Sequence, residues 1–252
     1  MRAIIGWLGS HTLVIFAVFI LIALFFWLLR FHRRLGITWQ EALAVSSAHV
    51  VIGWSCMKLL AIAEVGGNLD EAANIRIYGA VFTLPLLYYL WAKYTGKSKA
   101  LVMDIAAICV VLGATSGRLH CVTTANCCGG VPIISGRDFC WPIRELELIY
   151  YLVFCWYYIK RIQQGKTHGE VYPIYMITYG VLRFMCEFVR EEHTGQIGVF
   201  HLAHIWSLIS IAAGIIAYYF VEKNNGSGAS RRKKAWMKVS TRKGGKRNGS
   251  TA

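Results

Sequence analysis

Four polar side chains occur at helical spacing within the apolar segment YGVLRFMCEFVRE. They are Tyr179, Arg183, Glu187 and Arg190, separated by 4, 4 and 3 residues, which places them on one stripe of a helix. Ionisable groups at membrane depth cost roughly 2.5–3.5 kcal/mol each on insertion, and they usually face a polar interior. A structural Arg–Glu pair is one explanation. Two arginines, a glutamate and a tyrosine on one face favour a site for an anionic ligand.

A second polar region surrounds Arg118, within GATSGRLHCVTTANCCGG. Arg118 falls where an apolar segment ends, and His120 follows two residues later. Four of the eight cysteines lie in the connection that comes next: Cys121, Cys127, Cys128 and Cys140. Disulfides are the commonest explanation on an oxidising side of a membrane. A zinc site and a catalytic cysteine are the alternatives, but paired CxxC units and a partner base are absent, so we expect no metal ion.

The composition is that of a membrane protein. Of the 252 residues, 56% are hydrophobic and 16% are charged, which is too apolar for an ordinary soluble domain. The formal net charge is +14, and residues 223–252 supply ten of these positive charges with no acidic residue. We therefore expect a membrane domain at 1–222 and a basic, disordered cytoplasmic tail at 223–252. The tail lacks a fold that could read a sequence, so nucleic acid is not an expected partner.

Seven apolar ranges approach the length of about 17–25 residues that a membrane-spanning helix needs. The ranges are 12–29, 43–64, 78–94, 99–117, 146–159, 172–190 and 200–221. Basic residues follow the first, third, fifth and seventh ranges, and acidic residues occupy connections between the others. Because lysine and arginine favour the cytoplasmic side, this alternation predicts an all-α, polytopic membrane protein with seven transmembrane helices. Its N-terminus would lie outside and its C-terminus in the cytoplasm.

Four stretches, in order, resemble the prolipoprotein diacylglyceryl transferase family of bacterial inner membranes. The segment GRLHCVTTANCCGG resembles that family's GRxGxFxNGxxxG signature, and WPIRELELIYY resembles its YPTQLYE element. The segment YGVLRFMCEFVRE matches YGxxRFxxEFxR closely, and GQIGVFHLAHIWSLISIAAG resembles the closing LSxxQxxSLxxxxxG. The resemblance covers almost the whole chain.

The resemblance implies a reaction and a location. Members of the family transfer a diacylglyceryl group from phosphatidylglycerol to the cysteine thiol of a preprolipoprotein lipobox, the first step of lipoprotein maturation. The expected partners are phosphatidylglycerol, the lipobox peptide and membrane lipids, and no cofactor is expected. The protein would be a multi-pass protein of the bacterial plasma (inner) membrane, with its active site facing the outer side.

The matched positions imply roles for single residues. Arg118 and Arg183 match the family's essential arginines, and two guanidinium groups from different helices suit a clamp on one phosphate. His120 is the candidate proton acceptor for the attacking thiol. The remaining candidates for substrate binding are Tyr179, Glu187, Arg190, Glu147, Asn126 and Gly130.

The chain departs from the family pattern in the third apolar range. The family's HGG element corresponds to Thr83, Leu84 and Pro85 within IRIYGAVFTLPLLYY, so the histidine that would handle a proton is absent. The chain is then either a divergent transferase with another base or a paralogue that binds anionic lipid without this transfer. A small membrane transporter is a third interpretation, because intramembrane arginine and glutamate suit it. Against a transporter, no internal repeat is evident.

Overall fold

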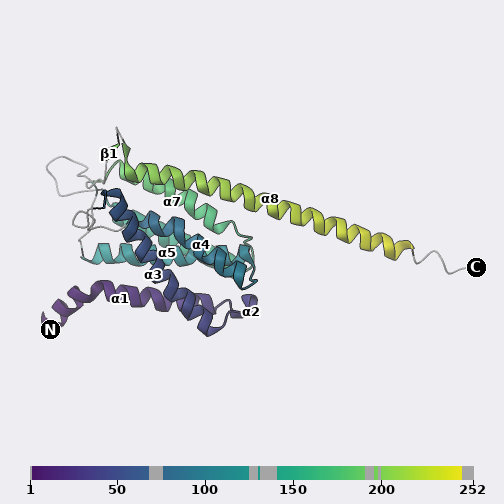
Figure 1. Cartoon of the computed structure of the whole chain (residues 1–252), viewed down its shortest axis with the longest axis horizontal. Coiled ribbons are helices and arrows are strands. Elements are labelled where there is room, and N and C mark those ends of the chain that lie inside the picture. Colours follow the sequence, from purple (N-terminus) through teal and green to yellow (C-terminus); the bar gives the residue numbers. More distant parts are fainter. Residues whose placement is uncertain are drawn as a thin grey trace, which may run out of the picture.

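Long helices make up most of the chain (Figure 1). The computed structural model describes the backbone of residues 2–67, 76–124, 130, 141–190, 196–197 and 200–245, and the side chains of residues 15–67, 76–122, 130, 141–190 and 200–225. The helices are α1 (Arg2–Leu29), α2 (His32–Leu35), α3 (Trp39–Glu64), α4 (Ile77–Tyr94), α5 (Lys99–Thr124), α6 (Ile143–Gln163), α7 (Val171–Glu187) and α8 (Leu202–Gly245). Two short strands, β1 (Gln196–Ile197) and β2 (Phe200–His201), pair antiparallel before α8. The expected all-α class is confirmed.

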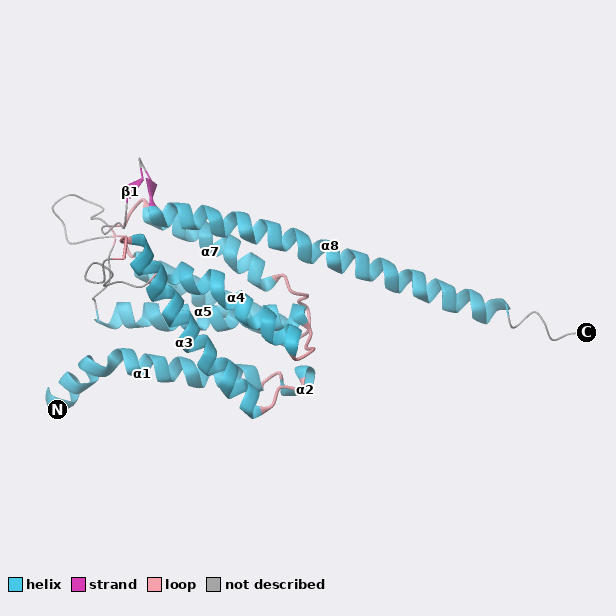
Figure 2. Ribbon diagram, in the orientation of Figure 1, coloured by secondary structure: helices cyan, strands magenta, loops and turns pink. Residues whose placement is uncertain are grey.

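Helix α5 lies at the centre of the bundle. It packs against α1, α4, α6 and α7, while α3 pairs with α4 and α7 pairs with α8. Its residues from Ile105 to Val111 are all buried, as expected for a helix that is apolar all round. Figure 2 shows the long helices side by side, with the β1 hairpin and the start of α8 at one end.

The helices differ in how well they qualify as membrane spans. Each of the seven predicted ranges overlaps one long helix. In the part of the chain that the structure describes, three helical stretches are long and apolar enough to cross a membrane: Trp39–Glu64, Lys99–Val122 and Leu202–Asn225. Ile15–Leu29 of α1 is a shorter apolar stretch. Seven crossings and the orientation of the termini stay predictions.

Helix α8 continues past the boundary expected at residue 222. It is helical to Gly245, so the backbone of 223–245 is regular where the sequence analysis expects a disordered tail. The segment contains no proline, and its lysines, arginines and alanines have high helix propensity. In Figure 1 this half of α8 extends away from the other helices. The division into a membrane domain and a basic tail stays a prediction.

A proline in α4 is matched by a tyrosine of α7. Pro85 has no N–H, so the carbonyl of Val81 one turn earlier lacks its usual helical donor. The hydroxyl of Tyr172 donates to that carbonyl with an O···O distance of 2.7 Å. Since Tyr172 is buried, water is not available as a substitute. This bond therefore ties α4 to α7.

The start of α7 is held by a carboxylate on α5. Asp104 accepts a hydrogen bond from the N–H of Gly169 at 2.8 Å and another from the N–H of Val171 at 3.0 Å. The first N–H groups of a helix have no partner inside it, and Asp104 supplies partners from a neighbouring helix. The carboxylate is fully buried. It fixes the register of α7 relative to α5, and α7 carries most of the candidate site.

Candidate active site

Five ionic side chains meet at the end of the bundle where α5 and α7 finish and α6 begins. They are Arg118 of α5, Glu147 of α6, Arg183 and Glu187 of α7, and Arg190 just after α7. We call these five residues the Arg–Glu cluster. Their side chains are between 0% and 16% exposed, so the cluster is largely removed from its surroundings. The structure thus brings together five residues that sequence analysis placed in three separate segments.

Glu147 is the centre of the cluster. One of its oxygens pairs with Nε of Arg118. The other lies 3.1 Å from Nη1 of Arg183 and 3.4 Å from Nη2 of Arg190. The Glu147 side chain is 0% exposed, and a buried charge is tolerated only when it is paired and hydrogen-bonded. Glu147 therefore fixes the positions of three guanidinium groups that come from two helices and the segment after α7.

Glu187 provides the second carboxylate. Its Oε2 lies 3.1 Å from Nη2 of Arg183 and 3.5 Å from Nε of Arg190. These contacts have the spacings of four and three residues that the predicted helical stripe requires. Arg183 and Arg190 are each held by both glutamates. Such double support orients a guanidinium group without using all of its five N–H donors.

The cluster carries a surplus of positive charge. Its three arginines face two glutamates, so these five described side chains together carry one net positive charge. Fifteen guanidinium N–H groups also exceed the roughly eight lone pairs that two carboxylates offer. Arg118 and Arg183 are the most accessible of the three arginines, with side chains 16% and 12% exposed. Electrostatics and donor number both suit a single bound anion, which would meet Arg118 and Arg183 first.

Tyrosine rings form a layer directly beneath the cluster. Tyr179 is fully buried, and its ring centroid lies 5.6–6.4 Å from those of four other tyrosines. These four, which complete what we call the tyrosine layer, are Tyr78, Tyr150, Tyr151 and Tyr175. The layer joins α4, α6 and α7 under the arginines, and sequence reasoning identified only Tyr179 of its members. The signal for the others was the density of tyrosine in the predicted spans.

Gly130 packs closely against the backbone of two neighbouring segments. It forms an isolated antiparallel bridge with Arg190, and its N–H donates to the carbonyl of Trp141 at 3.1 Å. A Cβ at Gly130 would lie 2.6 Å from that carbonyl oxygen and 2.9 Å from the carbonyl of Val189. Only glycine allows this approach. Gly130 thereby places Arg190 at the cluster, whereas Asn126 lies outside the described residues.

The structure places His120 on a different side of α5 from Arg118. The His120 ring contacts the ring of Phe16 on α1, with centroids 5.5 Å apart, while Arg118 pairs with Glu147 on α6. Residues that are two positions apart in an α-helix are separated by about 200° around the helix axis. His120 is therefore close to the cluster along the helix but does not share its face.

The other histidines in apolar segments have structural surroundings. Nδ1 of His204 accepts a hydrogen bond from the N–H of His201 at 3.2 Å, and the His204 ring lies 4.6 Å from that of Phe188. His49 is buried in α3, with Nδ1 3.0 Å from the hydroxyl of Tyr88. These contacts account for their positions without a ligand.

Thr83 and three of the cysteines lie within helices. The Thr83 hydroxyl donates to the carbonyl of Gly79 at 2.6 Å, within its own helix. Cys56, Cys109 and Cys155 lie within helices, outside any disulfide. The described residues contain no group of three potential ligands that could hold a metal ion. Of the four loop cysteines, Cys121 is described and the other three lie outside the described residues.

Comparison with known proteins points to one family. A family model described as prolipoprotein diacylglyceryl transferase matches residues 7–220. A phosphatidylglycerol-prolipoprotein diacylglyceryl transferase of Clostridium tetani is 24% identical over 162 residues, which are 59% of this chain and 65% of the relative. The enzyme of that name from Campylobacter curvus is 29% identical over 169 residues, 63% of this chain and 62% of the relative.

A longer match extends over most of both chains. The phosphatidylglycerol-prolipoprotein diacylglyceryl transferase of Dehalococcoides mccartyi strain 195 is 20% identical over 241 residues, which are 87% of this chain and 90% of the relative. In the Clostridium and Campylobacter matches, by contrast, this chain spans slightly less than two thirds of the relative's length. The matched region nevertheless includes every residue of the Arg–Glu cluster in the family comparison.

Proposed function

The chain belongs to the prolipoprotein diacylglyceryl transferase family, and from this premise we propose that it transfers a diacylglyceryl group from phosphatidylglycerol to a lipobox cysteine thiol. The names of its relatives specify phosphatidylglycerol and a prolipoprotein as substrates. The proposed partners are therefore phosphatidylglycerol, a preprolipoprotein lipobox peptide and the surrounding membrane lipids. The reaction would be the first step of lipoprotein maturation.

The observation that carries the proposal is the charge of the Arg–Glu cluster. A phosphate diester bears one negative charge, and the five side chains of the cluster together carry one net positive charge. Arginine binds phosphate oxygens in a two-pronged, charge-assisted manner. We assign Arg118 and Arg183 to the phosphate. Glu147 and Glu187 hold these arginines in place, and Arg190 contributes further positive potential.

The same groups support the chemical step. The thiolate attacks the glyceryl carbon that bears the phosphate, so a carbon–sulfur bond forms and the carbon–oxygen bond breaks. The electron pair of the broken bond stays with the leaving oxygen, and glycerol phosphate departs with an additional negative charge. Fixed arginines stabilise that developing charge without having to reorganise during the reaction. We assign Tyr179, one helical turn before Arg183, a hydrogen bond toward the headgroup.

The thiol proton must be taken up before or during attack, because the thiolate is the nucleophile. We propose His120 for this role, since it lies on α5 two residues after Arg118. A nucleophile and its leaving group occupy opposite sides of the attacked carbon, so base and phosphate clamp need not share one helix face. The lipobox thiol would then approach from the side of α1, where the His120 ring contacts Phe16.

The proposed placement in the cell follows from topology. With seven crossings and an external N-terminus, the cluster end of the bundle faces the outer side of the bacterial plasma membrane. Secreted preprolipoproteins present their lipobox on that side. Asn126 and Gly130 belong to the connection that would border the site there, and the basic segment after residue 222 would lie in the cytoplasm.

The test is product formation by the purified protein in proteoliposomes. Phosphatidylglycerol and a lipobox peptide are supplied, and the thioether-linked diacylglyceryl peptide is measured by mass spectrometry. Arg183→Ala should abolish product. Arg144→Ala is the matched control, because Arg144 is at the same end of α6 and, among the described residues, forms an ion pair with the partly exposed Glu145, at 3.7 Å. Product that persists at the wild-type rate in Arg183→Ala would contradict the proposal.

A failed reaction also has a defined meaning. If the folded wild-type protein binds phosphatidylglycerol but forms no thioether, it is a lipid-binding paralogue, and the replacement of the HGG histidine by Thr83 is its signature. If substrate flux occurs in the proteoliposomes instead, the transporter interpretation replaces the transferase.

A further inference from the structure

The second half of α8 begins where the helix is bonded to the connection between α6 and α7. The stretch of α8 that is apolar enough to cross a membrane ends at Asn225, and the side-chain amide of Asn225 donates to the carbonyl of His168 in that connection at 3.2 Å. The helix then continues to Gly245, about 30 Å further at 1.5 Å per residue. We call residues 226–245 the basic arm. In Figure 1 it extends away from the other helices.

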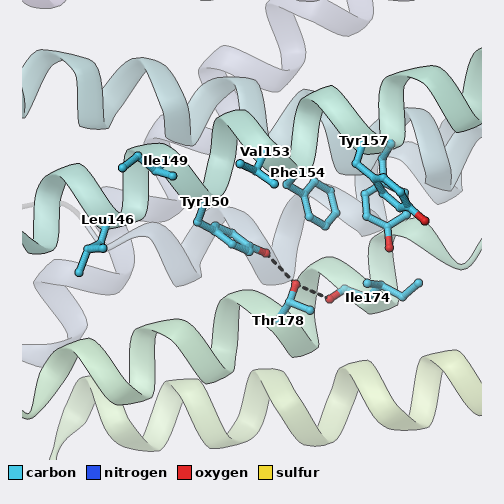
Figure 3. A pocket seen from close by; sticks show the side chains of 9 residues that line it. Leu146, Ile149, Tyr150, Val153, Phe154, Tyr157, Ile174 and Thr178 are labelled. Atoms are coloured by element: carbon cyan, nitrogen blue, oxygen red, sulfur yellow. Dashed lines mark hydrogen bonds between the residues drawn. The ribbon is translucent and has the colours of Figure 1, made fainter.

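The side chains at this end of α6 mark the level of the lipid headgroups. Exposed apolar side chains follow α6 as far as Tyr157 (Figure 3). The guanidinium group of Arg161 then lies over the Tyr157 ring, 5.4 Å from its centroid, and the ammonium group of Lys160 lies 4.3 Å from the centroid of Trp156. Aromatic rings with basic partners are typical of a membrane–water interface. Because Asn225 is bonded to the connection that follows α6, the basic arm begins close to this level.

The basic arm carries charge of one sign. It contains no aspartate or glutamate and seven basic residues, which are Arg231, Arg232, Lys233, Lys234, Lys238, Arg242 and Lys243. The described rim of the bundle at this end also carries basic residues, including Lys99, Lys160, Arg161 and Lys166. Like charges repel, so this rim does not attract the arm. A leaflet that contains anionic lipids has the opposite charge and attracts it.

The basic positions of the arm gather on one half of the helix circumference. Spacings of 3, 4 and 4 residues form one row, which consists of Arg231, Lys234, Lys238 and Arg242. Spacings of 4, 3 and 4 residues form a row beside it, which consists of Arg232, Trp236, Val239 and Lys243. On the opposite half, the only basic position is Lys233. Basic positions around a tryptophan-containing apolar strip are typical of a helix that lies in the membrane interface.

A straight arm would hold most of these charges too far from the headgroups. Along the helix axis, Arg231 lies about 9 Å and Lys243 about 27 Å beyond Asn225, whereas the Debye length is about 8 Å at physiological ionic strength. Gly226 and Gly228 follow Asn225 directly, and each glycine weakens a helix roughly fivefold relative to alanine. A lysine or arginine near an anionic surface improves binding by a similar factor of about five. Because several basic residues would gain this factor together, a bend at the glycines is favoured at an anionic membrane.

We propose that α8 bends at residues 226–228 and that the basic arm lies on the anionic headgroups of the leaflet on its own side of the membrane. The row that contains Trp236 and Val239 then faces the boundary between headgroups and acyl chains, and the basic positions on both sides of it meet lipid phosphates. With the C-terminus in the cytoplasm, this is the cytoplasmic leaflet. The arm thus binds anionic lipid at a second place, independent of the Arg–Glu cluster and of the proposed transfer reaction.

The experiment measures chymotrypsin cleavage after Trp236 in the full-length protein, reconstituted in nanodiscs. Trp236 is the only aromatic residue of 223–252, so intact-mass spectrometry identifies this cleavage. Both faces of a nanodisc are accessible and have the same lipids, which makes the orientation of the chain immaterial. Cleavage in discs of phosphatidylcholine should be on the order of a hundredfold faster than in discs that also contain phosphatidylglycerol or phosphatidylserine. This difference should disappear near 1 M salt, where the Debye length is about 3 Å.

Two single substitutions test which half of the helix meets the membrane. Lys238→Gln removes a charge from the basic row and should speed cleavage in anionic discs about fivefold. Lys233→Gln removes the same charge from the opposite half and should leave the rate nearly unchanged. Equal effects of the two substitutions would contradict the proposed face.

Two double substitutions test the bend. Gly226→Ala combined with Gly228→Ala favours the straight helix and should lower the protection by anionic discs at least fivefold. Gly244→Ala combined with Gly245→Ala is the matched control at the far end of the arm and should leave the protection unchanged. Full protection of both double variants would contradict a bend at residues 226–228.

The lipid comparison decides whether the partner is an anionic membrane. Equal cleavage rates in anionic and phosphatidylcholine discs would overturn the proposal. Protection by phosphatidylglycerol without protection by phosphatidylserine would also overturn it, because the arm would then recognise one headgroup rather than negative charge. An RNA fragment added to phosphatidylcholine discs tests the other polyanion. Protection by RNA in the absence of protection by anionic discs would assign the arm to nucleic acid instead.

Discussion

Glu147 contacts three guanidinium groups while its own side chain is fully buried. Removing one partner of a buried charge pair leaves other charges uncompensated, at a cost of roughly 3–5 kcal/mol. Glu147→Gln should therefore lower the free energy of unfolding by about that amount, and it should cut transfer activity on the order of 100-fold. Thermal unfolding in detergent and product assays measure the two effects.

Glu145→Gln is the control for this substitution, because Glu145 is on the same helix and pairs only loosely with Arg144 at 3.7 Å. It should retain wild-type stability and activity. Equal tolerance of Glu147→Gln and Glu145→Gln would contradict the role of Glu147 as the centre of the cluster.

The substitution Arg118→Lys changes the geometry of the proposed phosphate clamp and keeps its charge. Lysine keeps the positive charge but replaces a planar fork with a single ammonium group. We expect Arg118→Lys to lower kcat/KM on the order of 100-fold, with the protein still inserted and folded. Steady-state kinetics over a range of phosphatidylglycerol concentrations measure this change. Unaltered kinetics would mean that only charge is required at this position.

The residues of the cluster were predictable to different degrees. The stripe of Arg183, Glu187 and Arg190 followed from helical periodicity, and their mutual contacts have the expected spacing. Glu147 entered only through the resemblance, because the pairing of α6 with α7 is a tertiary contact that local spacing does not encode. The different helix faces of His120 and Arg118 could have been predicted from their spacing of two residues, but the sequence analysis did not predict them.

At the scale of elements, the bond from Tyr172 to the Val81 carbonyl explains how α4 tolerates Pro85. Tyr172→Phe should lower the free energy of unfolding by about 1–3 kcal/mol, because it leaves that carbonyl buried without a donor. In a Pro85→Ala background the helix regains its own N–H donor, so the same substitution should cost much less. Thermal unfolding of the four proteins in this double-mutant cycle gives the coupling. A coupling of zero would contradict the account.

The elements themselves were largely predictable, whereas their partners were not. Apolar length located a helix at each of the seven ranges, because a run of this length and hydrophobicity favours helix in a membrane. The Tyr172 and Asp104 bonds join residues 91 and 65–67 positions apart. Such distant pairs depend on how the helices pack, which single-sequence periodicity does not determine.

At the scale of the whole molecule, the charge alternation predicts that the cluster end of the bundle faces outward. Arg144→Cys lies at that end, and Lys166→Cys lies in the connection between α6 and α7 at the opposite end. A membrane-impermeant maleimide should label Arg144→Cys in intact cells and Lys166→Cys only after the membrane is opened, above the background of the wild-type cysteines. Labelling of both in intact cells, or the reverse order, would contradict the orientation.

Helix α8 extends beyond residue 222, where the sequence predicts a basic tail. The sequence suggested a disordered end after residue 222 because of its charge and its glycines, but the helix continues to Gly245. The high density of basic residues in this segment favours exposure to water. Lysine, arginine and alanine are nevertheless compatible with a helix. The bundle before it follows the predicted order of helices.

The positively charged Arg–Glu cluster should bind the phosphate of an anionic lipid. Native mass spectrometry of the purified protein, titrated with phosphatidylglycerol against phosphatidylcholine, measures this directly. We expect preferential phosphatidylglycerol binding by the wild-type protein and by Arg144→Ala, and loss of that preference in folded Arg183→Ala. An unchanged preference in Arg183→Ala would contradict it.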